Sequence, residues 1–165
     1  MSRAGVIKDA HVEAELVSEV KTAQAGHPFW VGLKLKVDDG WHIYWKDPGV
    51  SGMATRLIWD LPEGFEAGPV LWPKHQVIRT GDLTSYGYKG KVMLLTQIHP
   101  QEGILSDEES LVRLKARAEW LACKEECIPG KAELVLEVPV SVGPPVMDEK
   151  VRKLFEQTRR SEPAP

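Results

Sequence analysis

The 165-residue sequence has only two cysteines and no long apolar run, and each shortage narrows what the chain can do. A helix that crosses a bilayer needs about 20 consecutive apolar residues, and no stretch of this sequence approaches that length. The start, Met1–Gly5, lacks the apolar segment of a signal peptide. Such a start is expected of a cytosolic protein, and equally of a segment taken from a longer exported one.

The chain also has no excess of positive charge. It carries 21 lysine and arginine residues against 24 aspartate and glutamate residues, for a net charge of −3, and the basic residues are scattered along the sequence. This distribution argues against a nucleic-acid-binding surface. The hydrophobic share of 42% is ordinary for a globular protein, and the length is enough for one domain with a real core.

Helical periodicity is missing before residue 146, and most of the chain alternates apolar and polar residues as β-strands do. The turn Asp38-Asp39-Gly40 is a strong hairpin signal. We therefore expect an all-β fold, an antiparallel sandwich of eight or nine short strands. The strand candidates are residues 12–20, 29–37, 41–45, 56–61, 70–72, 85–88, 91–99, 112–120 and 132–140.

The end of the chain differs in composition from the rest. Gly143-Pro144-Pro145 ends the last strand, and Val151, Leu154 and Phe155 form a possible helical stripe. Residues 161–165 resemble a linker. The tail is either a short helix packed on the sandwich or a bridge to another domain. We expect an N-terminal extension at 1–9, the sandwich at 10–142, and a helix and linker at 143–165.

Cys123 and Cys127, with three residues between them, are the candidate reactive pair. A disulfide closing so small a loop stabilises a fold by only about 2 kcal/mol, so the spacing favours redox chemistry over stapling. In an extended strand the two Cα atoms would lie roughly 13 Å apart, and a disulfide needs less than about 7 Å. Oxidation therefore requires a turn or kink here. A passive disulfide that only orders a loop remains the alternative.

The residues around the pair do not indicate a metal site. Two thiols cannot complete a tetrahedral zinc site, and none of the histidines lies at a paired ligand spacing. We expect neither a metal nor another cofactor. Lys124 favours a thiolate on the neighbouring Cys123, whereas Glu125 and Glu126 oppose it.

A second group of residues, 40–49, is rich in aromatic side chains. Alternation places Trp41, Ile43 and Trp45 on one face of a strand and His42 and Tyr44 on the other. One face is expected to be core, and the other either lines a surface pocket or carries solvated rings. The sequence Tyr86-Gly87-Tyr88 has the same two interpretations.

Four blocks occur in order along the chain: GWHIYWKDPGVSG, WDLPEGFEAGPVLWP, SYGYKGKV and WLACKEECIPG. Together they resemble the N-terminal periplasmic domain of the DsbD family of thiol:disulfide interchange proteins, and most closely the branch that includes ScsB. The resemblance covers roughly residues 10 to 140. It implies an immunoglobulin-like sandwich, a periplasmic location, and no bound cofactor.

The resemblance also implies partners. In this family a membrane domain of the full-length inner-membrane protein passes electrons to periplasmic domains by successive dithiol exchange. The expected partners are a thioredoxin-like domain of the same or another protein and periplasmic substrate proteins that bear disulfides. The competing interpretation is a non-catalytic immunoglobulin-like binding module with a structural disulfide.

Carried onto this chain, the resemblance makes Cys123 and Cys127 the redox pair. The residues expected to line the site are His42, Tyr44, Asp82, Tyr88 and Trp120. Residues 76–85 correspond to a loop that caps the cysteines in DsbD, here with Asp82 as its only carboxylate. This chain has three residues between its cysteines where the best-known DsbD domain has five.

Overall fold

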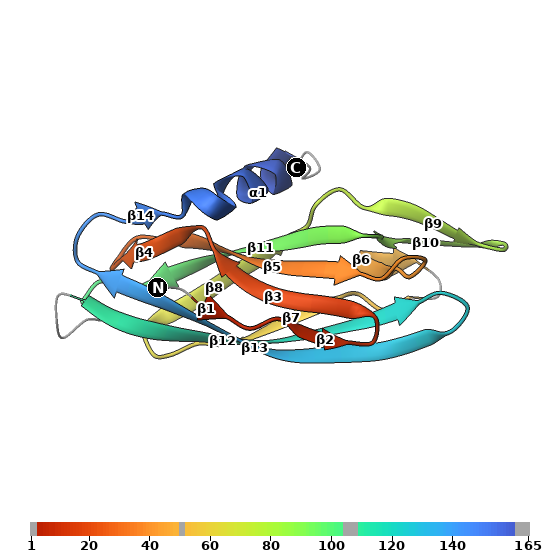
Figure 1. Ribbon diagram of the computed structural model, residues 1–165, viewed down its shortest axis with the longest axis horizontal. Helices are drawn as coiled ribbons and strands as arrows, with labels where there is room; N and C mark the ends of the chain where they lie inside the picture. Colours follow the sequence, from red (N-terminus) through yellow and green to blue (C-terminus); the bar gives the residue numbers. More distant parts are fainter. Residues whose placement is uncertain (1–2, 50–51, 104–108, 161–165) are drawn as a thin grey trace.

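Alternating side chains build two β-layers, and one helix covers the outside of the second (Figure 1). The computed structural model describes residues 3–49, 52–103 and 109–160. The elements are β1 (Arg3–Ala4), β2 (Ile7–Asp9), β3 (Val12–Ser18), β4 (Val20–Gln24), β5 (Phe29–Val37), β6 (Ile43–Gly49), β7 (Arg56–Asp60), β8 (Phe65–Leu71), β9 (Gln76–Thr80), β10 (Leu83–Tyr88), β11 (Lys91–Pro100), β12 (Glu109–Cys123), β13 (Cys127–Ser141), β14 (Val146–Met147) and α1 (Glu149–Arg160).

The first layer is a sheet in the order β14-β4-β13-β12-β7, with β1 also paired to β13. Its centre is the hairpin of β12 and β13, which pair without interruption from Glu109 opposite Ser141 to Cys123 opposite Cys127. Only β13 and β4 pair in parallel in this sheet. The longest uninterrupted ladder of the described chain therefore ends at the two cysteines.

The second layer is a sheet in the order β2-β3-β5-β11-β8, and all its pairs are antiparallel. A smaller sheet, β6-β10-β9, lies at one end of the sandwich (Figure 1). The bridge between His42 and Cys123 joins this smaller sheet to the end of β12. This joint positions the site described below.

The inward faces of the two large sheets form one core. Its largest fully buried side chains include Leu16, Leu33, Leu114 and Leu136, together with Trp120. Burial of each such side chain stabilises the fold by about 1.5–3 kcal/mol. The arrangement is an all-β, immunoglobulin-like antiparallel sandwich with a short C-terminal helix, which confirms the predicted fold class.

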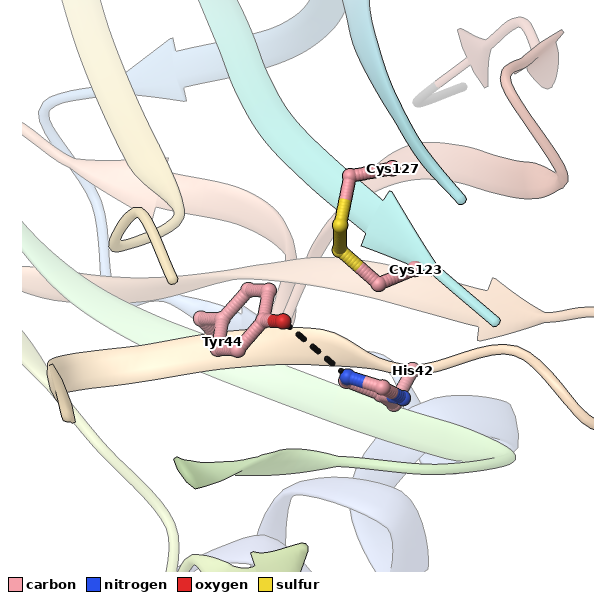
Figure 2. Close-up of a disulfide and its surroundings, with 4 residues drawn as sticks. All are labelled: His42, Tyr44, Cys123 and Cys127. Carbon is pink, nitrogen blue, oxygen red and sulfur yellow. Dashed lines mark hydrogen bonds between the residues drawn. A yellow bond between two sulfur atoms is a disulfide. The ribbon is translucent and has the colours of Figure 1, made fainter. Parts of the chain in front are cut away.

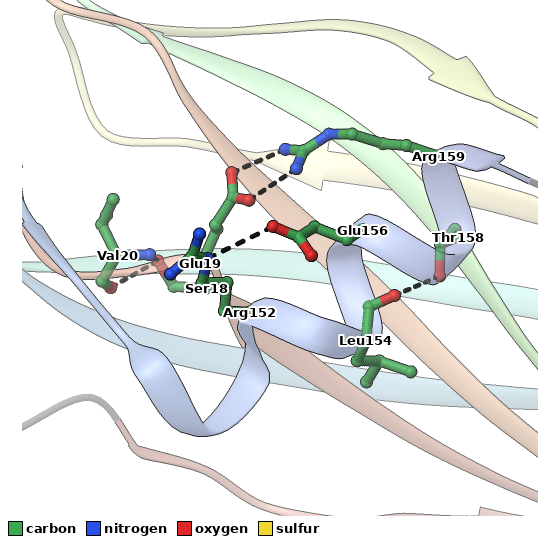
Figure 3. A network of polar contacts seen from close by, with 8 residues as sticks. All are labelled: Ser18, Glu19, Val20, Arg152, Leu154, Glu156, Thr158 and Arg159. Atoms are coloured by element: carbon green, nitrogen blue, oxygen red, sulfur yellow. Dashed lines mark hydrogen bonds and ion pairs between the residues drawn. The ribbon is translucent and has the colours of Figure 1, made fainter.

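Helix α1 packs on the outer face of the second sheet. Phe155 is fully buried against Met93 and Leu95 of β11. Glu19 accepts two hydrogen bonds of 2.6 Å from the guanidinium of Arg159, an arrangement visible in Figure 3. The helix is thus attached to the sandwich at 149–160. None of the helices that the structure describes is long and apolar enough to cross a membrane.

Two segments that were expected to lack strands contain them. Residues 76–85 form the hairpin of β9 and β10 rather than a loop, with Ile78 as the buried residue of β9. Residues 3–9, expected as an extension, contain β1 and β2, which pair with β13 and β3. The predicted linker at 161–165 lies outside the described residues.

Candidate functional site

The two cysteines occupy the tip of the β12–β13 hairpin. Strict alternation holds these strands in register, so Cys123 and Cys127 face each other as their last pair. Three residues connect the strands, and the amide of Lys124 donates a hydrogen bond of 3.0 Å to the carbonyl of Glu126. The turn brings the two Cα atoms to 4.1 Å, and the sulfurs form a disulfide. The turn required for oxidation is therefore present.

The two sulfur-bearing residues differ in accessibility. Cys123 is buried, with 3% of its surface exposed, whereas Cys127 is exposed. Pro129 is also exposed and Ile128 is half-buried, which gives Cys127 an apolar border. An incoming thiolate can therefore approach Cys127, while Cys123 lies on the protein side of the bond.

The start of β6 forms the floor of the site. The amide of His42 donates to the carbonyl of Cys123 at 3.0 Å, and the amide of Cys123 donates to the carbonyl of His42 at 2.9 Å. The Nε2 atom of His42 lies 3.1 Å from the Tyr44 hydroxyl oxygen, in hydrogen-bonding contact. Figure 2 shows these two side chains beside the disulfide. The structure thus brings His42 and Tyr44 together next to Cys123, and leaves their role in the chemistry as a prediction.

Burial favours the neutral form of both of these side chains. Desolvation raises the pKa of the Tyr44 phenol above its ordinary value of 10.0. Desolvation, and secondarily the positive charge of Lys89, lower the pKa of His42 below its ordinary value of 6.5. Next to the buried sulfur the protein therefore presents a neutral, hydrogen-bonded pair rather than a fixed charge.

The segment that follows β6 packs on Tyr44. The amide and the hydroxyl of Thr55 both donate to the carbonyl of Tyr44, at 3.3 Å and 2.9 Å. A Cβ atom placed on Gly52 would lie 2.3 Å from the Tyr44 ring, so only glycine allows this close approach. Sequence reasoning missed both residues as part of the site, although Gly52 ends the first of the four blocks.

The remaining predicted lining residues lie in different environments. Asp82 is exposed in the turn between β9 and β10, and among the described residues it makes no hydrogen bond or ion pair with the cysteine site. Tyr88 is buried, its hydroxyl donates to the carbonyl of Pro73 at 2.8 Å, and burial raises its pKa. Trp120 is fully buried in the core. Within the described residues none of these three side chains forms a hydrogen bond, ion pair or ring contact with Cys127, and their place in the site stays a prediction.

No group of three histidine, cysteine, aspartate or glutamate side chains able to hold a metal ion occurs within the described part of the chain. A disulfide at a solvent-facing tip exchanges with thiolates without a cofactor.

Comparisons with known proteins agree with this geometry. Residues 11–139 match the family described as "Thiol:disulfide interchange protein DsbD, N-terminal". The crystal structure of the N-terminal periplasmic domain of ScsB from Proteus mirabilis superposes with a TM-score of 0.70 at 15% identity. That match covers 97% of this chain but 59% of the ScsB chain. At this identity it shows the shared fold.

Other comparisons add little. A crystal structure of the yeast GGA1 GAE domain matches with a TM-score of 0.40 and 9% identity, over 79% of this chain and 96% of that chain, which is too distant to inform the fold. No curated protein matches the chain at a significant level. The family match spans most of the sandwich and contains both cysteines. The chain therefore belongs to the family of N-terminal domains of the thiol:disulfide interchange protein DsbD.

Proposed function

We propose that this domain transfers two electrons to partner proteins by reversible opening and closing of the Cys123–Cys127 disulfide. The observation that carries the proposal is the unequal exposure of the pair at the tip of the hairpin, in a chain of a thiol:disulfide interchange family. The exposed Cys127 is the sulfur that meets the partner. The buried Cys123 is the sulfur that completes the exchange.

The delivery of electrons takes two displacements. In the reduced domain the thiolate of Cys127 attacks one sulfur of a partner disulfide, which forms a mixed disulfide and releases the other partner sulfur as a thiolate. The thiolate of Cys123 then attacks the Cys127 sulfur, which re-forms the disulfide of the structure and releases the second partner thiolate. The domain is oxidised by two electrons, and the partner is reduced by two.

Recharging is the reverse sequence. A dithiol donor attacks the exposed Cys127 sulfur, displaces the Cys123 thiolate, and leaves as a disulfide when its own second thiol attacks. Following the family, we propose a membrane-embedded reductase domain as the source of these electrons. Thioredoxin-fold domains and other periplasmic proteins with disulfides are the proposed acceptors. The similarity to a periplasmic domain of ScsB supports a periplasmic location.

We also propose roles for the neighbouring side chains. His42 and Tyr44 lie beside Cys123 and shield its sulfur with neutral groups. The hairpin that carries Asp82 is the proposed cap of the site. The buried side chains of Tyr88 and Trp120 stabilise the strands β10 and β12 that carry them. Gating by residues 76–85 requires that this hairpin move when a partner binds.

Trapping of the mixed disulfide tests the proposal. The Cys123→Ser variant retains the exposed thiol, and we expect it to accumulate a mixed disulfide with an oxidised thioredoxin-fold protein, visible by non-reducing electrophoresis and mass spectrometry. Cys127→Ser, the matched control, should accumulate far less, because its remaining thiol is buried. If neither variant forms a mixed disulfide, the result would count against the relay.

A measured reduction potential separates the relay from the binding-module alternative. A relay pair is expected to have a reduction potential close to that of thioredoxin-like couples, about −270 mV. Structural disulfides typically have reduction potentials below about −300 mV. Equilibration of the parent domain with glutathione or thioredoxin buffers of known ratio gives this value. A reduction potential below about −300 mV would identify a passive disulfide and favour the binding module.

A further inference from the structure

A groove of about 600 Å³ lies on the outer face of the second sheet, beside the part that α1 covers. Leu154 and Gln157 of α1 line one side, and residues of β3, β5 and β11 line the base. The segment from Pro73 to Gln76 and the end of β10 line the rest.

Positive charge surrounds the groove, although the chain as a whole has a net charge of −3. Two of the five lysines that line it are paired across the sheet: Lys34 lies 3.7 Å from Glu15, and Lys36 lies 4.0 Å from Glu13. The other three lysines are exposed and have no carboxylate partner among the described residues. These are Lys74, Lys89 and Lys91.

The inner lining of the groove is partly apolar. Pro73, Met93 and Leu154 contribute to it. A partly apolar lining with exposed lysines around it fits an extended peptide that carries both acidic and apolar side chains. A free inorganic anion would leave the apolar surface exposed.

The groove adjoins the cysteine site through consecutive backbone pairs. Tyr88, which lines the groove, pairs with Ile43 across β10 and β6, and the preceding residue His42 pairs with Cys123. Two strand spacings of about 4.8 Å separate β10 from β12, so Tyr88 lies about 10 Å from Cys123. Cys127 lies one strand further, with its Cα atom 4.1 Å from that of Cys123. Lys89 is close enough to His42 to lower its pKa. An extended segment covers the roughly 14 Å to Cys127 with about four residues.

We propose that the groove binds an acidic, partly apolar segment of the protein that exchanges its disulfide with Cys127, and that Lys74, Lys89 and Lys91 select this partner. The proposal rests on the proposed function. The lysines hold the partner beside the exposed sulfur and orient its approach, as complementary charges do in other transient complexes.

Binding of a model peptide to the oxidised domain tests the groove without any redox step. The probe is a fluorescein-labelled peptide of alternating glutamate and leucine, compared by anisotropy with the same peptide built from glutamine and leucine. The test variant is Lys74→Glu, Lys89→Glu, Lys91→Glu. The control is Lys21→Glu, Lys115→Glu, Lys131→Glu, which changes net charge equally at exposed lysines outside the groove.

We expect the parent domain to prefer the glutamate peptide, and the preference to disappear at 1 M salt, where the Debye length is about 3 Å. The groove variant should bind the peptide about tenfold more weakly, as expected for three exposed charge pairs, and the control less than twofold more weakly. Equal losses in both variants would overturn the proposal. Binding to vesicles of phosphatidylglycerol but not to the peptide would also overturn it.

A kinetic experiment distinguishes failure of this inference from failure of the relay. Each peptide carries one cysteine, blocked as a mixed disulfide with thionitrobenzoate, three to six residues from its first glutamate or glutamine. Attack by the reduced domain releases the coloured thionitrobenzoate, and the ratio of the two rates reports the preference. The groove variant should lose this preference and the control retain it.

The outcomes of the kinetic experiment are distinct. Equal rates for both peptides with the parent domain would sink the groove proposal and leave the relay intact. Lysine-dependent peptide binding with no release of thionitrobenzoate from either peptide would sink the relay and show a groove that serves another purpose. Faster reaction of the acidic peptide, lost only in the groove variant, supports both.

Discussion

The main chains of His42 and Cys123 exchange two hydrogen bonds, of 3.0 Å and 2.9 Å, and this pair joins the smaller sheet to the cysteine hairpin. The buried sulfur residue and the His42–Tyr44 pair are thereby held in place by backbone contacts rather than by side chains alone. Tyr44 follows two residues later, and its hydroxyl is in hydrogen-bonding contact with the ring of His42. Changes in this strand are therefore expected to affect the cysteines directly.

Stability of the oxidised domain should decrease on acidification because of His42. Its folded-state pKa lies below the value of 6.5 that it takes when unfolded, so between these two values the unfolded chain binds more protons. The contribution of His42 to the free energy of unfolding is fully present above pH 6.5. It is lost as the pH falls through 6.5 toward the folded-state pKa. Urea denaturation at pH 7.5 and 5.5 measures the difference.

The variant His42→Gln keeps a hydrogen-bonding side chain but does not titrate, so it should lose much of this pH dependence. His27→Gln, at an exposed histidine, is the control and should behave like the parent protein. If the urea midpoint changes equally in His42→Gln and in the parent protein between pH 7.5 and pH 5.5, His42 is not the responsible group.

Replacement of Gly87 by alanine should disrupt the pairing of β6 with β10. An added Cβ atom would come within 1.9 Å of the carbonyl oxygen of Ile43, and this is backbone that cannot rotate away. We expect destabilisation of about 1–3 kcal/mol, the usual range for an overpacked site. Gly5→Ala is the control, because nothing lies within 4 Å of its added Cβ. Chemical denaturation compares the two, and equal midpoints would contradict the expectation.

Truncation of Phe155 should release α1 from the sheet. This side chain is fully buried against Met93 and Leu95, and Phe→Ala changes at such sites cost about 3–5 kcal/mol. Hydrogen exchange should show faster exchange throughout 149–160 in Phe155→Ala. Lys153→Ala, on the exposed side of the same helix, should leave exchange unchanged. Retained protection of the helix in Phe155→Ala would mean that other contacts hold it.

The strands with clear alternation were predictable because one of their faces is buried. Residues 112–120 and 132–140 fall within β12 and β13, and their pairing places the cysteines at a turn, as the sequence indicated. The stripe of Val151, Leu154 and Phe155 predicted α1 for the same reason. Prediction succeeded wherever a single face determined the pattern.

Other features depend on distant partners and leave no local pattern. β9 buries only Ile78, so its alternation was too weak to identify a strand. β1 and β2 exist because β13 and β3 offer edges to them. The closeness of the two cysteines was predictable from their spacing. The burial of Cys123 was not, because it follows from the bridge to His42, 81 positions earlier in the chain.

The unbroken ladder between β12 and β13 has a kinetic consequence. It pairs residues 109–123 with 127–141 and holds the Cα atoms of the cysteines 4.1 Å apart with backbone bonds that do not require the sulfur–sulfur bond. After reduction, the two thiols should therefore remain neighbours at a high effective concentration, as well-oriented groups within one molecule do. In a mixed disulfide through Cys127, the neighbouring Cys123 thiolate should therefore attack the Cys127 sulfur and release the partner thiolate faster than a small thiol such as glutathione can intercept the complex. The covalent complex is then short-lived, and few electrons are lost to other thiols.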